Sequence, residues 1–307
     1  MKTRYVFIVG LPRTGTKLMK NILENAQDVK CSVSPENFFL GRAIHPGIRY
    51  KMRKIGDMSD DANVRRFVDN MYAGKFFGKY WRRLKDGSLG VDKEVMLRRI
   101  LDSDRSDKGI YAVLLQVHTE VTDNTILGDK TGPHLYHVPT LLEWFPEAKI
   151  VHTFRDPRAI LASEHKRRYR FLNNKSIRKR FMTFPYKLLD PFLSLMVVLY
   201  ITIAWLRAVK LHFEYKKRYP RNYYLSKFED LVSDPEGRIR KLCEFLGIEF
   251  HSEMLNPEKV GSSFGPRGGT GFDKQALHRW KDYLKPWMNT WLLLWGKKFL
   301  RELGYVR

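Results

Sequence analysis

Cysteine is scarce in this sequence of 307 residues, in which only Cys31 and Cys243 occur. The two cysteines have no neighbouring pattern of metal ligands, so the sequence predicts neither a structural zinc site nor a disulfide framework. A chain with two thiols fits a reducing compartment, and we therefore expect a cytoplasmic protein. A single disulfide between the two cysteines stays open as an alternative.

Long apolar segments are also few. The run from Tyr5 to Val9 is too short for the core of a signal peptide and ends at a glycine turn, which predicts a first strand rather than a leader. The segment from Phe192 to Leu206 is apolar on all faces, but a membrane span needs about 20 apolar residues, and Asp190-Pro191 and Arg207 limit its ends. Three interpretations stay open: a buried core helix, a helix that contacts a membrane from its surface, and a true span.

Acidic residues are too few to balance the basic ones. Lysine and arginine number 56 against 33 aspartates and glutamates, which gives a formal net charge of +23. Such a surface attracts anions in general, so nucleic acid, acidic glycans, a membrane surface and a phosphorylated cofactor all fit the charge alone. The phosphate-binding motifs described below favour a nucleotide cofactor, and we expect no nucleic-acid partner.

Repeats, low-complexity segments and Gly/Ser/Pro-rich linkers are absent as well, which favours a single domain over residues 1–307. Short β-branched runs alternate with helical patterns, and this alternation predicts an α/β fold with a central parallel sheet flanked by helices. The candidate strands are Tyr5–Val9, Val29–Ser32, Thr125–Gly128, Lys149–Phe154 and Tyr223–Phe228. A helical insertion is expected over about residues 36–122, where apolar residues recur at helical spacing, as in Val64, Phe67, Val68 and Met71.

The segment from Gly10 to Lys17 lies between an apolar strand and a helical pattern. A glycine turn that leads into a helix directs free backbone N–H groups and the positive end of the helix dipole at a phosphate group. Thr14 and Thr16 add hydroxyl donors, while Arg13 and Lys17 add permanent positive charge. The segment therefore predicts a phosphate-binding loop.

This loop differs from the loop of P-loop kinases and NTPases, in which a lysine directly follows the second glycine. Thr16 occupies that position here, and the cation that can reach a terminal phosphate-like group is Arg13, two residues before Gly15. The sequence also shows no acidic motif that would hold a metal ion beside the loop. A P-loop nucleotide-dependent kinase therefore stays in view only as the alternative.

A second strand–turn–helix unit covers Lys149–Ser163, with Asp156 as a candidate helix cap. Arg155 ends the strand, and Ser163 follows about two helical turns later, so the two side chains can bracket an anion. Arg167 lies one turn further along the same face. A capping or salt-bridging role for Arg155 is the alternative.

The two motifs together resemble those of the sulfotransferases that use 3′-phosphoadenosine 5′-phosphosulfate (PAPS), particularly the tyrosylprotein and bacterial branch. Residues 7–16 are similar to the 5′-phosphosulfate loop of that family, and residues 155–163 to its 3′-phosphate motif. Residues 228–235 and 276–280 are similar to weaker, later motifs, so the likeness covers nearly the whole chain. It implies a P-loop NTPase-like sulfotransferase fold and transfer of a sulfonyl group from PAPS to a hydroxyl or amine.

The resemblance also implies which residues bind the donor. The 5′-phosphosulfate is expected to contact Arg13, Thr14, Gly15, Thr16 and Lys17, and the 3′-phosphate to contact Arg155, Ser163 and Arg167. A glycine-rich loop is expected to close over the nucleotide, with contacts from Ser262, Ser263, Arg267, Gly268 and Arg279. Two residues depart from the family pattern: Lys17 replaces a usual threonine, and Phe228 replaces a usual tyrosine whose hydroxyl bond is missing here.

Sulfonyl transfer is an in-line displacement in which charge builds on the leaving nucleotide, where fixed cations stabilise it without need of a metal ion. Arg13 is the candidate for the bridging oxygen, and the resemblance implies that Lys130 faces the sulfonyl group. Glu36 resembles the family's catalytic base, which takes the proton of the acceptor. The alternative bases are His45, His134 and His137, and Lys130 has the alternative role of a solvated loop lysine.

No motif identifies the acceptor, so a glycan, a lipid, a phenol and a peptide all stay open as partners. Basic residues are dense over 165–170 and 178–180, upstream of the apolar segment, and exceed what one phosphate needs. Each lysine or arginine near an anionic membrane contributes about 1 kcal/mol to binding. We therefore expect peripheral membrane association and an amphiphilic acceptor, with a merely solvated basic surface as the alternative.

Overall fold

The computed structural model describes residues 4–31, 38–39, 47–76, 78–117, 125–172, 186–259 and 268–306, with the side chains of 169–172 and 186–190 left aside. The chain divides into two compact units. Unit 1 comprises Met1–Val9 and Leu23–Val151, and unit 2 comprises Gly10–Ile22 and His152–Arg307. The single domain expected over residues 1–307 stays a prediction.

The strands pair in a five-stranded sheet with the order β2-β3-β1-β4-β5. Its strands are β1 (Arg4–Gly10), β2 (Val29–Lys30), β3 (Ile126–Asp129), β4 (Lys149–Phe154) and β5 (Tyr223–Lys227). Both β1 and β2 pair in parallel with β3, and the β1 register runs from Arg4 opposite Ile126 to Phe7 opposite Asp129. The predicted α/β fold is confirmed, although β2 is shorter than expected and β5 ends before Phe228, because a helix begins there.

Unit 1 contains the predicted helical insertion. Its helices are α2 (Ile48–Ile55), α3 (Asp61–Tyr72), α4 (Lys79–Lys85), α5 (Lys93–Leu101) and α6 (Asp107–Gln116), and a 3₁₀ turn (Gly132–His137) with α7 (Val138–Trp144) follows β3. Asp60 caps α3 by accepting a hydrogen bond from the Ala62 N–H. The face predicted from spacing, Val64, Phe67, Val68 and Met71, is fully buried. These helices therefore form because their apolar stripes have a core to enter.

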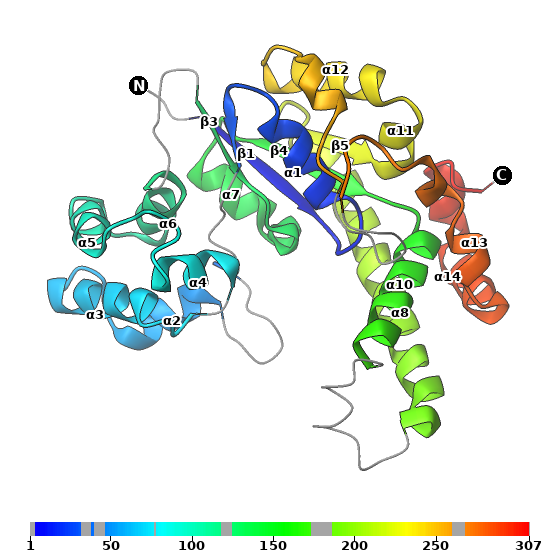
Figure 1. Ribbon diagram of the computed structural model, residues 1–307, viewed down its shortest axis with the longest axis horizontal. Coiled ribbons are helices and arrows are strands. Elements are labelled where there is room, and N and C mark those ends of the chain that lie inside the picture. The colour runs from blue at the N-terminus through cyan, green and yellow to red at the C-terminus, as the bar shows by residue number, and fades with distance from the viewer. Residues whose placement is uncertain are drawn as a thin grey trace. The chain divides into compact units, whose positions relative to one another are not determined.

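Unit 2 contains most of the remaining helices. They are α1 (Thr16–Glu24, entering unit 1 at its end), α8 (Pro157–Leu172), α10 (Tyr186–Arg218), α11 (Phe228–Ser233), α12 (Pro235–Leu246), α13 (Trp280–Tyr283) and α14 (Pro286–Glu302), with two 3₁₀ turns (Ser252–Leu255 and Lys274–Leu277). Helix α8 packs against α10 and α13, and α14 packs against α10 (Figure 1).

The apolar segment Phe192–Leu206 lies inside α10, which continues through Pro191 instead of ending there as predicted. Packing against α8 holds this stretch helical despite the hydrogen bond that proline cannot donate. One side of the segment is buried, while side chains such as Tyr200 and Ile203 are exposed. Among the described residues, one helix has the length and composition to cross a membrane, over Pro191–Arg218, and 39% of its most apolar window is buried.

Candidate functional site

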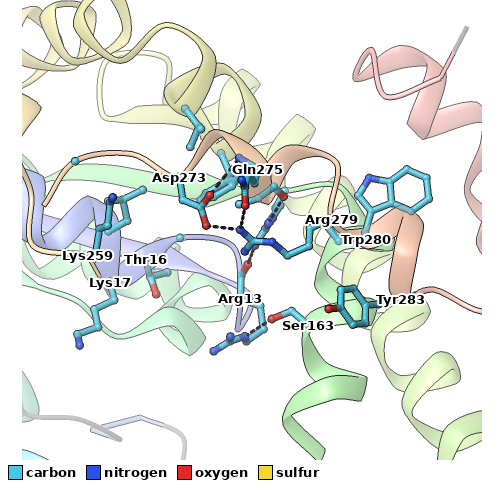
Figure 2. Close-up of a pocket in the computed structure, with 18 of the residues that line it drawn as sticks. Arg13, Thr16, Lys17, Ser163, Lys259, Asp273, Gln275, Arg279, Trp280 and Tyr283 are labelled. Carbon is cyan, nitrogen blue, oxygen red and sulfur yellow. Dashed lines mark hydrogen bonds and ion pairs between the residues drawn. The ribbon is translucent and has the colours of Figure 1, made fainter. Parts of the chain in front are cut away.

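A cavity of about 720 Å³ lies in unit 2 at the ends of strands β1 and β4 (Figure 2). Its walls come from the loop between β1 and α1, the start of α8, the start of α11, and the segment from Gly268 to Tyr283. Three of the charged side chains at its rim are Arg13, Lys17 and Arg279. The cavity is thus placed where loops that follow parallel strands usually bind ligands.

The loop between β1 and α1 has the backbone that a phosphate loop requires. Gly10 and Gly15 have φ of 147° and 97°, which L side chains rarely adopt. A Cβ on Gly10 would lie 2.5 Å from the Thr153 carbonyl oxygen, so the loop passes too close to β4 for a side chain there. Arg13 also has a positive φ, 72°, and such strained residues cluster at functional sites. Helix α1 begins at Thr16, so the N–H groups of its first turn lie beside the cavity.

Thr14, expected to contact the phosphosulfate, is bonded within the protein in this structure, and its contact with the donor stays a prediction. Its side chain is 2% exposed, and its hydroxyl donates to the Leu11 carbonyl at 2.7 Å. It also lies 2.8 Å from the hydroxyl of Thr153 on β4. A threonine hydroxyl has one proton to donate, and in Thr14 this proton is used in the bond to Leu11 within the loop. The Thr14 hydroxyl therefore supports the loop, while Gly15, Thr16 and Lys17 line the cavity.

Arg13 and Ser163, expected at opposite ends of the bound nucleotide, meet directly. The Arg13 Nε donates to the Ser163 Oγ at 2.8 Å (Figure 2). Burial lowers the pKa of the Arg13 guanidinium, Glu164 opposes that shift, and Arg167 adds to it. An arginine stays charged despite such a shift, so a permanent cation lies at the cavity wall.

Arg155 brings a second cation to the cavity. Its two Nη atoms donate to the carbonyls of Arg13 and Ala276, at 3.1 and 3.0 Å, and its buried Nε has no partner among the described residues. Its guanidinium lies over the ring of Phe228, with 4.0 Å between Cζ and the ring centroid. Burial lowers the pKa of Arg155, an effect that Glu229 opposes and Arg13 reinforces. The site therefore concentrates positive charge that an anionic ligand would neutralise.

The role of Phe228 was missed by the sequence reasoning, which noted only an absent hydroxyl. Besides supporting Arg155, this ring contacts the phosphate loop, because a Cβ on Gly15 would lie 2.9 Å from its Cδ2. The aromatic character of Phe228 was visible in the sequence. Its partners were not, because Gly15, Arg155 and Phe228 are far apart along the chain.

The late segment of the chain closes another wall of the cavity. Arg279, expected to contact the nucleotide, lines the cavity and donates to Asp273 Oδ2 at 2.8 Å and to Gln275 Oε1 at 3.4 Å (Figure 2). Asp273 also accepts a hydrogen bond from the Gln275 N–H. Neither Asp273 nor Gln275 was predicted, and they orient the Arg279 side chain. Gly268 also lines the cavity, and its contact with the nucleotide stays a prediction.

The other expected donor contacts have different positions. Arg167 forms two close bonds to Glu164, at 2.6 and 2.7 Å, its side chain is 65% exposed, and it is not among the residues that line the cavity. Its contact with the 3′-phosphate stays a prediction. The remaining expected residues lie outside the described part of the chain: Glu36, His45, Ser262, Ser263 and Arg267.

Unit 1 contains Lys130, which is half-buried directly after β3. The preceding Asp129 accepts a hydrogen bond from the buried Tyr111 hydroxyl, and His134 Nδ1 lies 3.5 Å from Asp129 Oδ2. Burial lowers the pKa of His134, and Asp129 opposes this shift. His134, an alternative base in the sequence analysis, is thus held in a buried polar cluster. In the described part of the chain, no group of three or more His, Cys, Asp or Glu side chains is placed to hold a metal ion.

Comparison with known proteins bears on both the family and the fold. The model of the sulfotransferase family matches residues 5–252. The chain is 26% identical over 261 residues to the omega-hydroxy-beta-dihydromenaquinone-9 sulfotransferase Stf3 of Mycobacterium tuberculosis and of Mycobacterium bovis. This alignment covers 79% of the chain but 62% of those relatives, so the chain spans less than two thirds of their length.

Two solved structures show the same fold at low identity. The sulfotransferase domain of the Synechococcus PCC 7002 olefin synthase superposes with a TM-score of 0.54 at 18% identity, covering 95% of this chain and 94% of that domain. The sulfotransferase STF9 of Mycobacterium avium superposes with a TM-score of 0.50 at 14% identity, covering 98% of this chain and 77% of that one.

Proposed function

The chain belongs to the sulfotransferase family, and on that premise we propose that it transfers a sulfonyl group from PAPS to a hydroxyl or amine of an acceptor. The observation that carries the proposal is the pair of cations, Arg13 and Arg155, at one cavity beside a glycine loop and a helix start. A donor with phosphates at both ends needs charge at two places in one site. The cavity offers this arrangement.

The donor is proposed to bind with its 5′-phosphosulfate at Gly15, Thr16 and Lys17 and its 3′-phosphate at Arg155 and Ser163. The N–H groups at the start of α1 can donate to the 5′-phosphosulfate. The Arg155 guanidinium, whose Nε has no partner among the described residues, can donate to the 3′-phosphate. Arg13 bonds Ser163 in this structure, and we propose that this bond exchanges for bonds to the donor. Ser262, Ser263, Arg267, Gly268 and Arg279 are proposed to complete the nucleotide contacts.

The proposed reaction is a displacement at sulfur. The acceptor oxygen or nitrogen forms a bond to sulfur while the bond from sulfur to the bridging oxygen of the nucleotide breaks, and Glu36 accepts the proton that the acceptor loses. The nucleotide leaves as 3′,5′-adenosine bisphosphate, and Arg13 stabilises the charge on its departing oxygen. Lys130 is proposed to stabilise the sulfonyl oxygens. Arginine and lysine supply the charge for which other transferases use a metal ion.

A lipid is the acceptor that we propose among glycan, lipid, phenol and peptide. The support is the 26% identity to Stf3, whose name states a hydroxylated dihydromenaquinone as its substrate. An acceptor of this kind is dissolved in membranes. We therefore also propose that the enzyme works in the cytoplasm at a membrane surface.

Calorimetry with 3′,5′-adenosine bisphosphate tests the donor site. We expect binding without magnesium, and a preference for ATP with magnesium would support a P-loop kinase instead. Incubation with sulfur-labelled PAPS and fractionated lipid, glycan and peptide acceptors then tests the transfer. Label that enters only water-soluble acceptors would contradict the lipid.

A further inference from the structure

Helix α10 carries large apolar side chains that are exposed to solvent. Phe192, Met196, Tyr200 and Ile203 are 61, 48, 61 and 65% exposed, and Leu195 beside them is 39% exposed. Their spacing of three and four residues puts them on one face of the helix. We call these five residues the α10 face. Contiguous apolar exposure of this kind marks a surface that binds another apolar surface.

The opposite side of α10 is fixed inside unit 2. Val198, Ile201 and Trp205 are buried, and Ser194 accepts a hydrogen bond from Arg168 of α8. The Trp205 Nε1 donates to the carbonyl of Arg155 at 3.1 Å, so α10 also supports a residue of the proposed donor site. A span would require lipid around the whole helix and would break these contacts. The α10 face therefore suits a helix that lies on a surface, although α10 has the length of a span.

Two basic residues lie on the same side of α10 as the α10 face, nearer the C-terminal end of the helix. Arg207 and Lys210 are exposed, and they follow Ile203 at spacings of four and three residues on the same side. Apolar side chains followed by lysine or arginine on one face are typical of helices at the interface of anionic membranes. The net charge of +23 adds long-range attraction to such a surface.

The neighbouring helix α14 repeats this composition. Trp287, Leu294 and Trp295 are 43, 73 and 57% exposed, and after Gly296 come the exposed Lys297 and Lys298. The two helices pack closely where a Cβ on Gly296 would lie 3.4 Å from Trp205. Tryptophan is enriched where a protein meets the headgroup region, because its ring is apolar and its N–H is polar.

We propose that the α10 face, together with Arg207 and Lys210, docks on the surface of an anionic lipid bilayer without spanning it. This inference deepens the proposed function and rests on its lipid acceptor, because docking brings the enzyme to the phase that holds such a substrate. Charge complementarity favours an anionic bilayer over a second copy of this chain, because a second copy would place arginine and lysine next to other positive charges.

Co-sedimentation with vesicles of phosphatidylglycerol and phosphatidylcholine in equal parts, against phosphatidylcholine alone, tests the docking. The wild type is expected to bind the anionic vesicles at low salt and to be released by high salt. The Tyr200→Ser/Ile203→Asp variant is expected to bind at least about tenfold more weakly. The matched control is Tyr50→Ser/Val95→Asp, which changes side chains that are 52 and 44% exposed in unit 1, and it should bind like the wild type.

A second pair of variants tests the charge. Arg207→Gln/Lys210→Gln is expected to weaken binding about 30-fold, whereas Arg98→Gln/Arg99→Gln, which removes two exposed arginines of α5, should have little effect. Calorimetry with 3′,5′-adenosine bisphosphate on every variant shows that the donor site is intact. A wild type that ignores this nucleotide but docks as described would overturn the proposed function and leave the docking in place.

Three results would overturn the docking itself. One is equal binding of the α10 variants and their matched controls to anionic vesicles. Another is retention of the wild type on vesicles after carbonate washing, which would show insertion across the bilayer. The third is a dimer in light scattering that the Tyr200→Ser/Ile203→Asp variant abolishes, which would make a second copy the partner.

Discussion

The guanidinium of Arg155 lies over the ring of Phe228, with 4.0 Å from Cζ to the ring centroid. A cation stacked on an aromatic face is held in one orientation without a direct ion pair to a carboxylate. In the described part of the chain, the two Nη atoms of Arg155 donate to the backbone carbonyls of Arg13 and Ala276. The stack therefore keeps a positive charge available to an anionic ligand.

Replacing Arg155 by alanine is expected to weaken binding of 3′,5′-adenosine bisphosphate about 10- to 100-fold, because a charge-assisted contact is lost. The contact is present before and during transfer, so turnover at saturating PAPS should change little. Calorimetry and steady-state kinetics measure the two effects. Arg240→Ala on α12, which removes an exposed arginine paired with Glu236, is the matched control. Unchanged nucleotide affinity in Arg155→Ala would remove Arg155 from the donor site.

Arg13→Ala is expected to lower turnover about 100- to 1000-fold, since it removes a fixed cation from the leaving oxygen. Nucleotide affinity should fall less than turnover, because the departing charge develops mainly in the transition state. The positive φ of residue 13 is as costly for alanine as for arginine, so strain adds little to the comparison. Turnover close to that of the wild type would contradict the placement of Arg13 at the leaving group.

Gly15→Ala is expected to reduce nucleotide binding and to lower the melting temperature. Its Cβ would lie 2.9 Å from Phe228 Cδ2, and its φ of 97° is strained for any L side chain. Gly90→Ala is the control, because Gly90 also has a positive φ, 73°, but open space around it. The control should lose about 1 kcal/mol of stability from backbone strain and retain nucleotide binding. Equal losses of nucleotide binding in both variants would show that the contact with Phe228 is unimportant.

Glu36→Gln is expected to lower turnover about 100-fold or more with little change in nucleotide affinity, because a general base acts only on the acceptor. His134→Gln should keep the turnover of the wild type once its folding has been checked by circular dichroism. Wild-type rates for Glu36→Gln combined with a rate loss for a correctly folded His134→Gln would transfer the role of base to His134.

The stability of unit 2 is expected to fall with acid below about pH 6.5. His152 and His212 both contact the Tyr223 hydroxyl, at 2.6 and 3.0 Å, and burial lowers the pKa of these residues to about 3 and about 4. In the unfolded chain these histidines bind protons near about pH 6.5, whereas in the folded chain they stay neutral down to their lowered pKa values. The free energy of unfolding therefore decreases as the pH falls from about 6.5 toward about pH 4. The slope is about 1.4 kcal/mol per pH unit for each histidine.

Urea unfolding of the wild type and of His152→Phe between about pH 7.5 and 4.5 measures this dependence. The range begins above the histidine pKa of the unfolded chain, about 6.5, and extends toward the lowered pKa values of the folded chain. The variant should show a shallower slope of stability with pH. Identical slopes would mean that His152 is protonated to the same extent in the folded and unfolded chains.

Local features of the fold were predictable. Strand β4 has the predicted bounds, Lys149–Phe154, because a short run with β-branched residues is followed by a capping aspartate, whose Oδ1 accepts from the Arg158 N–H at 2.8 Å. The phosphate loop was also predictable, because its glycines and the start of α1 are neighbours in the sequence. The contacts of the Thr14 hydroxyl with Leu11 and Thr153 were not predicted, because Thr153 lies on another strand, and its contact with the donor stays a prediction.

The sequence by itself determined the residues that carry charge to the donor, the glycines that permit their loop, and the family to which these motifs belong. It could not tell which side of α10 faces solvent, because a segment that is apolar all round has no preferred face until α8 and the sheet cover one. Likewise the stack of Arg155 on Phe228 and the bond from Arg279 to Asp273 depend on how the chain returns to the cavity. Local propensity acts over a few residues, whereas these contacts join parts of the chain that only tertiary packing brings together.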